Sequence, residues 1–553
     1  MRSLTLLASA LTSAILTSAG GAMAQAPAPA PQSPPAPGAG APTAPPPPPA
    51  APTAPATAAP SAPASSGLDL TTLQSLHARG ILSQAEYEAA VRDVAASTGT
   101  ARAEEATSLV FGKWVTTLYG FLEGDTIYDT TQSFRDLAGN AQVLRPGGAA
   151  PPEPASPQTY GGDHGQTQFG VRNSRFGLRL RPPGTETVHT SGLLEMDFLG
   201  NQPGGISQSA FYTSPTLRIR HAMFRVETPV VDVLVGQYWH LFGWQSDYQP
   251  NTVEIQGVPG ELYARTPQVR VSKRFESKPV TVEVAVAALR PPATGSEVPE
   301  GQAGVRVAAN EWTGMQTIGA TATSVRPASL AITGDYRHFE VPEASSLVPA
   351  AMVKTDSGAV AADAFLPVLP ARADKHDNAL SLTGELVYGY GIADMYTNLN
   401  SGVEFPNIPN TTGLANVPTW PQNIDNGLVA YDINPGEFAL HPIQWTSYLV
   451  GIQYYFPGLD GRAWISANYS HMQSQNSADF ARPLNQAPNP MQYYYQTSTA
   501  QVRKGEDWFD VNLFFDPLAS VRVGLEGAAF YDHYADGVTA IDYRGQASGF
   551  FIF

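Results

Sequence analysis

The chain has 553 residues, of which 10% are aromatic and only 14% are charged, and it contains no cysteine. Its formal net charge of −16 argues against non-specific nucleic-acid binding, which requires a basic surface. The lack of cysteine excludes disulfide bonds and a lipid-modified N-terminal cysteine, so stability must come from hydrogen-bond closure or a large core.

The first 24 residues have the features of a secretory signal peptide. Arg2 precedes an apolar run at 4–15, and Ala22-Met23-Ala24 is a small-residue cleavage site, so we expect the mature chain to start at Gln25. The run is too short for a retained membrane helix, and no other stretch approaches the roughly 20 apolar residues that a spanning helix needs. A membrane crossing would therefore require a β-barrel.

Two further segments precede the candidate barrel. Residues 25–66 are almost entirely Ala, Pro, Ser and Thr, which predicts a disordered linker that would reach on the order of 130 Å as polyproline II. It is either a passive linker or a spacer that contacts the cell wall. Residues 67–112 contain two short amphipathic helices and a link, with Gly80 at a C-cap position and a capping box at 83–86. This module either associates with copies of itself or a partner, or is a helical spacer.

Residues 113–553 show runs of alternating apolar and polar residues, separated alternately by short and long connections. This pattern predicts an all-β fold, an antiparallel transmembrane β-barrel of about sixteen strands. An even number of strands places both ends of the barrel on the periplasmic side. The expected strands are 114–128, 167–181, 188–199, 217–228, 230–242, 265–275, 280–289, 314–324, 329–341, 378–388, 390–399, 442–456, 461–473, 505–515, 520–535 and 538–553.

The connections and the last residue support this interpretation. Tight, turn-rich connections are expected on one side and long ones on the other, which is typical of outer-membrane barrels. The chain stops at Phe553, an aromatic residue that suits the lipid-facing end of a final strand. The short connections are 182–184, 228–229, 277–279, 326–327, 457–461 and 516–517, and the long ones are 129–166, 243–264, 341–376, 400–440 and 476–504.

Charged residues occupy one parity of these strands, which we assign to the lumen. On the fourth strand the assignment is ambiguous, because Arg218 and Arg220 have the parity opposite to His221 and Arg225. We favour Arg218 and Arg220 inside, since two cations that face lipid would cost several kcal/mol. The predicted pore-lining residues are Arg175, Arg179, Arg218, Arg220, Arg270, Arg274, Glu123, Asp125, Glu195 and Asp197.

The chain resembles the DcaP-like group of trimeric outer-membrane porins over residues 113–553. The likeness lies in the order of the stretches 118–122, 173–178, 194–198, 218–222, 235–239 and 267–270. It implies a homotrimer in the outer membrane of a Gram-negative-type bacterium, with the N-terminal extension in the periplasm. It also implies passive diffusion of small anions such as dicarboxylates, without enzymatic activity, cofactor or metal.

The resemblance further implies that the loop after the fifth strand folds inward and narrows the lumen. Here that loop is 243–264, and it carries Asp247, Glu254 and Glu261. Acidic loop residues opposite an arginine-rich wall would select solutes by charge, and arginine forks hold carboxylates. Alternatively, the wall arginines neutralise neighbouring carboxylates such as Glu195 and Asp197. The two interpretations are compatible.

Three functions remain open at this stage. The first is a porin for small, anionic solutes. The second is a structural or adhesive barrel whose loops face outward and whose linker meets the cell wall. The third is an outer-membrane hydrolase, for which Asp335 and His338 are candidate triad members without a recognisable nucleophile. The pairs Asp163-His164 and Asp532-His533 lie at expected loop ends, where solvation is the simpler explanation than metal binding.

Overall fold

A computed structural model describes residues 108–553 with gaps. The signal peptide, the linker and the helical module predicted for residues 1–107 lie outside the described residues. Within the described part, no helix is both long and apolar enough to cross a membrane. The gaps are 112–113, 137, 139–141, 147–157, 186, 201–215, 255, 294, 319–322, 343–350, 373–375, 397–426, 433–438, 483–496 and 499–501.

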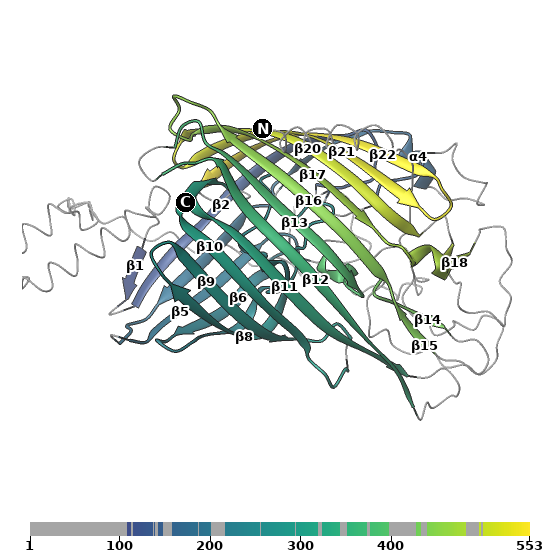
Figure 1. Cartoon of the computed structure of the whole chain (residues 1–553). Coiled ribbons are helices and arrows are strands. Elements are labelled where there is room, and N and C mark those ends of the chain that lie inside the picture. The colour runs from purple at the N-terminus through teal and green to yellow at the C-terminus, as the bar shows by residue number, and fades with distance from the viewer. Residues whose placement is uncertain are drawn as a thin grey trace, which may run out of the picture. The chain divides into compact units, whose positions relative to one another are not determined.

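Most of the described strands form one large antiparallel sheet (Figure 1), apart from the two small pairs β14–β15 and β18–β19. Its strands are β2 (Trp114–Asp129), β3 (Gln166–Gly170), β4 (Arg175–Arg181), β5 (His189–Asp197), β6 (Arg218–Glu227), β7 (Asp232–Trp239), β8 (Arg265–Glu276), β9 (Val280–Leu289), β10 (Glu300–Gln316), β11 (Ser324–Pro342), β12 (Met352–Leu369), β13 (Leu380–Tyr390), β16 (Gln444–Tyr455), β17 (Ala463–Gln473), β20 (Arg503–Leu518), β21 (Val521–Tyr534) and β22 (Thr539–Ile552).

This sheet closes on itself. The last strand, β22, pairs with the first, β2, through Gly124↔Gly549 and the pairs on either side. The terminal residue takes part, because the Gly120 amide donates to the Phe553 carbonyl at 2.8 Å and the Phe553 amide donates back at 3.0 Å. Since β3 and β4 both pair with β2 as two halves of one strand, the described residues form a sixteen-stranded barrel. The predicted fold class is confirmed.

Several strand assignments made from sequence differ from the structure. The stretch 352–369, expected to be loop, forms β12. The strand expected at 314–324 overlaps only the last residues of β10, which begins at Glu300, and the first residue of β11. The strand expected at 390–399 does not form among the described residues. Strand β13 ends at Tyr390, and the chain then continues into the short 3-10 helix η2 (Ala393–Met395). The turn expected at 326–327 lies inside β11. Pairing of β12 with both neighbours along its length outweighs its weak apolar alternation.

The remaining elements lie at the two ends of the barrel. Strand β1 (Ser108–Phe111), in a stretch expected to be a link, pairs with the start of β2. The tight turns expected at 182–184, 228–229, 277–279 and 457–461 lie near the same end, whereas the turn expected at 516–517 lies inside β20. At the long-loop end lie β14 and β15 (Figure 1). The other bounds are α4 (Gln158–Gly162), η1 (Phe242–Trp244), β14 (Val429–Asp432), β15 (Ala439–Pro442), η3 (Ser477–Phe480), β18 (Ala481–Arg482) and β19 (Thr497–Ser498).

Side chains alternate between an apolar outer face and a polar inner face. On β2, Leu118 and Leu122 are exposed on the outside, whereas Glu123 and Asp125 are buried inside. Period-two alternation of this kind is what a barrel wall requires, because successive residues of a strand point to opposite faces. The outer surface is consequently apolar, as expected of a barrel in contact with lipid.

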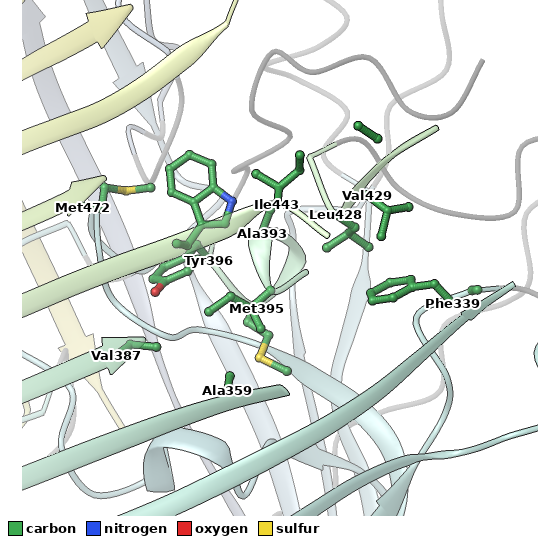
Figure 2. Packing of buried hydrophobic residues seen from close by; sticks show 14 of the residues in the cluster. Phe339, Ala359, Val387, Ala393, Met395, Tyr396, Leu428, Val429, Ile443 and Met472 are labelled. Carbon is green, nitrogen blue, oxygen red and sulfur yellow. The ribbon is translucent and has the colours of Figure 1, made fainter. Parts of the chain in front are cut away.

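Loops pack into the interior at the long-loop end. Met395, the last residue of η2, and the adjacent Tyr396 join Leu428 and Val429 in an apolar cluster with the inward residue Phe339 of β11 (Figure 2). The Tyr396 hydroxyl also lies 2.8 Å from the Ser447 hydroxyl on β16. The segment predicted to be a strand thus folds inward as an internal support.

Candidate functional site

A loop crosses the inside of the barrel. It comprises residues 240–264, between β7 and β8, and we refer to it as the crossing loop. Its Asn251 accepts a hydrogen bond from the Trp464 indole at 2.7 Å, and the Asn251 carbonyl accepts one from Ser466, both on β17. In the closed ring of described strands, β17 stands opposite β7. The loop therefore spans the full width of the lumen, as the resemblance implied for 243–264.

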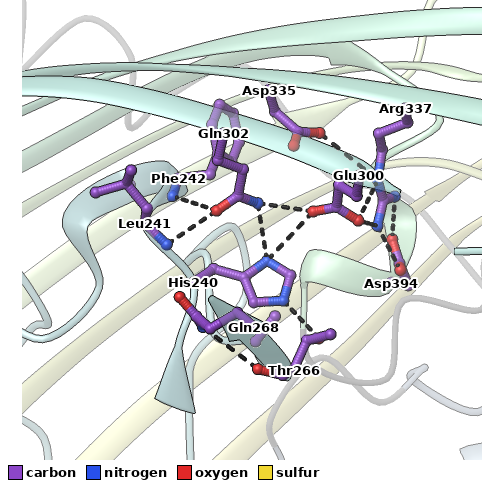
Figure 3. A network of polar contacts seen from close by, with 12 residues as sticks. His240, Leu241, Phe242, Thr266, Gln268, Glu300, Gln302, Asp335, Arg337 and Asp394 are labelled. Atoms are coloured by element: carbon purple, nitrogen blue, oxygen red, sulfur yellow. Dashed lines mark hydrogen bonds and ion pairs between the residues drawn. The ribbon is translucent and has the colours of Figure 1, made fainter. Parts of the chain in front are cut away.

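The first part of the crossing loop is fixed by a polar network on β10 and β11 (Figure 3). The Gln302 carbonyl oxygen accepts hydrogen bonds from the amides of Leu241 and Phe242, at 2.9 and 3.0 Å. The Gln302 amide in turn donates to Glu300 at 2.7 Å. Arg337 completes the network by donating to Glu300 at 2.9 Å.

The chain turns sharply after this anchor. Gly243 has a φ of 75°, a conformation that glycine adopts without strain. A Cβ at this position would also lie 2.6 Å from Leu262 and 3.2 Å from the Glu385 carboxyl, where the two ends of the loop meet. The Leu262 amide donates to Glu385 of β13 at 2.9 Å, which holds the returning end.

The far part of the loop contacts the last strands. The Val253 amide donates to Asn512 on β20, and the Glu254 amide donates to Glu526 on β21, both at 2.8 Å. The loop thus touches β10, β11, β13, β17, β20 and β21 with its own backbone. Fixed backbone contacts on many strands make it a rigid partition across the lumen.

Arginines predicted from sequence gather where the loop returns to β8. Arg218 binds Asp197 through two hydrogen bonds, at 3.0 and 2.6 Å, and Arg220 lies 2.8 Å from Glu195 and 3.2 Å from Asp197. Arg175 is 3.7 Å from Glu195. These three arginines therefore form ion pairs with Glu195 and Asp197, as one of the two interpretations of the sequence expected.

A β-bulge resolves the ambiguity on β6. Glu195 pairs with His221 whereas the next residue, Met196, pairs with Ile219, so Arg220 is an extra residue on β6. Because a bulge shifts the parity of a strand, Arg218, Arg220 and His221 all point inward. The alternation of residues along the strand could not show this arrangement, because it allowed either Arg218 and Arg220 or His221 and Arg225 to point inward, but not both pairs.

One cation of this group was not identified from the sequence. Arg265, the first residue of β8, lies 4.7 Å over the Trp239 ring and 5.0 Å over the Tyr263 ring, and one of its terminal nitrogens has no hydrogen-bond partner in the described part. With Arg175, Arg218 and Arg220 it gives four guanidinium groups around two carboxylates. This basic cluster carries net positive charge.

A second group of arginines faces the first acidic residue of the loop. Asp247 lies 3.6 Å from Arg306 on β10 and 3.3 Å from Arg326 on β11. Neither arginine was predicted from the sequence to line the pore, because the first half of β10 was not predicted as a strand and Arg326 was assigned to a turn. Alternating inward positions along 300–316 would have been the signal for Arg306.

The other two acidic loop residues do not face the predicted arginines. Glu254 lies 3.2 Å from Arg544 on β22, and Glu261 accepts a hydrogen bond from the Val258 amide at 3.0 Å. Burial raises the pKa of Glu254 to about 8, although Arg544 acts against this rise. Burial also raises the pKa of Glu261 well above its ordinary value, and the nearby Glu385 adds to the effect.

The remaining predicted residues are scattered. Arg179 stacks on Tyr119 at 4.2 Å, and Arg270 donates to the Trp239 carbonyl at 2.5 Å. Arg274 is exposed near the short-turn end of β8, 3.7 Å from Glu283. Glu123 and Asp125 lie together on β2, and neither forms an ion pair with an arginine of the basic cluster. The pore-lining role assigned to all these residues stays a prediction.

The candidate catalytic residues Asp335 and His338 lie on opposite faces of the barrel wall. Asp335 points into the barrel and is 7% exposed, whereas His338 has the opposite parity and pairs with Asp356 at 2.7 Å on the outer face. A hydrolase triad built on these two residues is therefore excluded by geometry.

Comparisons with known proteins address the fold. No protein-family model matches the chain, and no curated protein matches it either. Among solved structures, the outer membrane channel DcaP of Acinetobacter baumannii is similar with a TM-score of 0.54, at 15% identity, over 80% of this chain and 99% of that one. The fold is that of an outer-membrane porin. At this identity, the likeness establishes the fold alone.

Two other structures overlap more loosely. The anion-selective porin from Comamonas acidovorans matches with a TM-score of 0.41 and 9% identity, over 80% of this chain and all of that one. OprB of Pseudomonas putida matches with a TM-score of 0.41 and 10% identity, over 79% of this chain and 94% of that one. These overlaps are too loose to support an inference about this chain.

Proposed function

We propose that the protein is an outer-membrane porin through which small anionic solutes, carboxylates in particular, diffuse passively. The observation that carries this proposal is the unequal exposure of charge along the crossing loop. The Arg218 and Arg326 side chains are 35% and 31% exposed, whereas their acidic partners, Asp197 and Asp247, are 0% and 17% exposed. Solutes inside the barrel would meet guanidinium groups first.

The chemistry of these groups fits carboxylates. A guanidinium presents two parallel N–H donors that match the two oxygens of a carboxylate, and Arg218 already holds Asp197 in this way. Partly exposed guanidiniums would exchange such partners along the path of a solute. Fixed charges at a narrow point select solutes by sign and size without a chemical step, which suits passive diffusion.

The same proposal includes the setting of the channel. An apolar outer face around a closed ring fits the lipid of an outer membrane, with the short turns toward the periplasm. A homotrimer and contact between the N-terminal region and the cell wall belong to the proposal as well. The fold shared with the DcaP channel supports the proposal of a channel.

Liposome swelling tests the function directly. Purified full-length protein would be inserted into liposomes, which are then diluted into isotonic solutions of a disodium dicarboxylate or of a neutral sugar of similar mass. We expect faster swelling with the dicarboxylate. An adhesive or purely structural barrel, closed by its loops, would give no swelling with either solute, and equal rates for both would refute the anion preference.

A further inference from the structure

A set of buried oxygen atoms lies at the seam where the barrel closes. Glu123 on β2 is 3% exposed, and both of its carboxylate oxygens lack a hydrogen-bond donor. The neighbouring inward residue, Asp125, is also 3% exposed and is among the charged groups that act on Glu123 most strongly. Two carboxylates buried side by side are unfavourable without a positive charge between them.

Neutral oxygen-bearing side chains surround Asp125. Ser548 donates to Asp125 at 2.6 Å, Gln546 at 3.3 Å and Asn173 at 3.4 Å. The amide oxygens of Asn173 and Gln546 have no hydrogen-bond partner, although these residues are only 1% and 4% exposed. The seam therefore holds four unpartnered, deeply buried oxygen atoms next to the Asp125 carboxylate.

The cations nearby are engaged elsewhere. Arg175 lies 3.7 Å from Glu195, and Arg544 is bound to Asp129 at 2.8 Å and to Glu254 at 3.2 Å. Within the described part of the chain, no lysine or arginine reaches Glu123 or Asp125 within 4.0 Å. Arg175 acts on Glu123 electrostatically, but it forms its ion pair with Glu195 and not with Glu123 or Asp125.

We propose that Glu123, Asp125, Asn173 and Gln546 bind a hard divalent cation, Ca²⁺ or Mg²⁺, at the junction of β2, β22 and the break between β3 and β4. Hard cations take oxygen ligands from carboxylates, amide carbonyls and hydroxyls, which are the groups present here. A half-turn of the Asn173 or Gln546 amide exchanges its nitrogen for its oxygen and directs that oxygen toward Asp125.

The position gives the cation a structural role. Asp125 pairs with Ser548 across the seam between the first and last strands, and Asn173 lies in the interruption between β3 and β4. An ion held by residues from these three segments would join the strands that close the ring. The inference is independent of conduction, because it concerns the folded barrel and not the passage of solute.

Calorimetric titration tests the site. Full-length protein, refolded in detergent without lipopolysaccharide and dialysed against EDTA, would be titrated with CaCl₂ and separately with MgCl₂. We expect one bound ion per chain, with a Kd on the order of 10⁻⁴ to 10⁻³ M for Ca²⁺. Glu123→Gln and Asp125→Asn should each weaken binding by at least about 10-fold. Glu311→Gln, at an exposed site paired with Lys278, is the matched control and should bind as the wild type does.

Thermal unfolding gives a second measurement. The melting temperature of the wild type should rise in CaCl₂ relative to EDTA, and this rise should be lost in Glu123→Gln. If the two carboxyl groups instead share a proton, the wild type will bind no ion and Glu123→Gln will be as stable as the wild type in EDTA. Either the absence of binding by the wild type or unchanged binding by both variants would overturn the proposal.

Discussion

The crossing loop contacts two sides of the lumen, and its carboxylate groups differ in solvent exposure between them. On one side Asp247 faces Arg306 and Arg326 and remains partly exposed. On the other side Glu254 is buried beside Arg544 of β22. Charge on the first side is available to solvent and solutes, whereas on the second side it is removed by burial. The difference shows that the acidic total of the sequence does not determine the charge at the narrow point.

Shortening the crossing loop would remove the difference between the two sides of the lumen, and we expect it to have the largest effect on conductance. Replacing residues 246–260 with a short Gly-Ser linker removes the partition between the two sides while it leaves the anchor at Gln302 intact. Single-channel conductance in planar bilayers should rise several-fold, and ion preference should weaken. Conductance equal to that of the wild type, with strand content preserved by circular dichroism, would mean that the loop does not limit flow.

The buried side predicts a pH dependence of stability. The pKa of Glu254 is about 8 in the folded chain, above its ordinary value near 4.3, so the folded state binds more protons than the unfolded state between these values. The stability contributed by protonated Glu254 is full below about pH 4.3 and is lost as the pH rises through about 8.

Glu254→Gln should therefore reduce the loss of stability between pH 5 and pH 8, by about 1.4 kcal/mol for each pH unit across which Glu254 titrates. Denaturant unfolding of both proteins at the two pH values measures this difference. Asp247→Asn, on the partly exposed side, is the control. Parallel pH profiles for the wild type and Glu254→Gln would contradict the burial of this charge.

The exposed side predicts a change in selectivity. Arg218→Gln together with Arg326→Gln removes two partly exposed guanidiniums that contact the crossing loop, and we expect the anion-over-cation permeability ratio to fall by at least about two-fold. Lys278→Gln, in a short turn and 90% exposed, should leave the ratio unchanged. An equal fall in the Lys278 variant would show a general effect of net charge and no local site.

A single replacement should have the smallest effect. Arg306→Gln leaves Asp247 with Arg326 at 3.3 Å, so the loop keeps one of its two ionic contacts on this side. The permeability ratio should change less than in the double variant, and the melting temperature should stay close to that of the wild type. A change as large as that of the double variant would show that Arg306 contributes as much to the narrow point as Arg218 and Arg326 together.

The sequence sufficed for the fold because barrel physics leaves few choices. Alternation along β2 identified Glu123 and Asp125 as inward, and the terminal Phe553 indicated the closing strand. Backbone groups in lipid must all be paired, so a closed sheet was the remaining solution. The strand β12 was missed because its outward positions include Lys354 and Asp356, which break the apolar signal although the strand pairs along its length.

The candidate site was less predictable, for three physical reasons. Inward parity located Arg218 and Arg220, but a bulge of one residue added His221, and no local pattern announces a bulge. The partners of Glu254 depend on the position of the loop inside the barrel. Contacts between residues 259 and 272 positions apart in the sequence determine that position. Arg265 acquired importance only through stacking on Trp239 and Tyr263.

Reversal potential across a planar bilayer tests the central claim most directly. With the wild-type protein inserted and a KCl gradient applied, exposed guanidiniums beside buried carboxylates should give a potential whose sign reports greater permeability to chloride than to potassium. A potential of the opposite sign, or no current through correctly folded protein, would contradict the account.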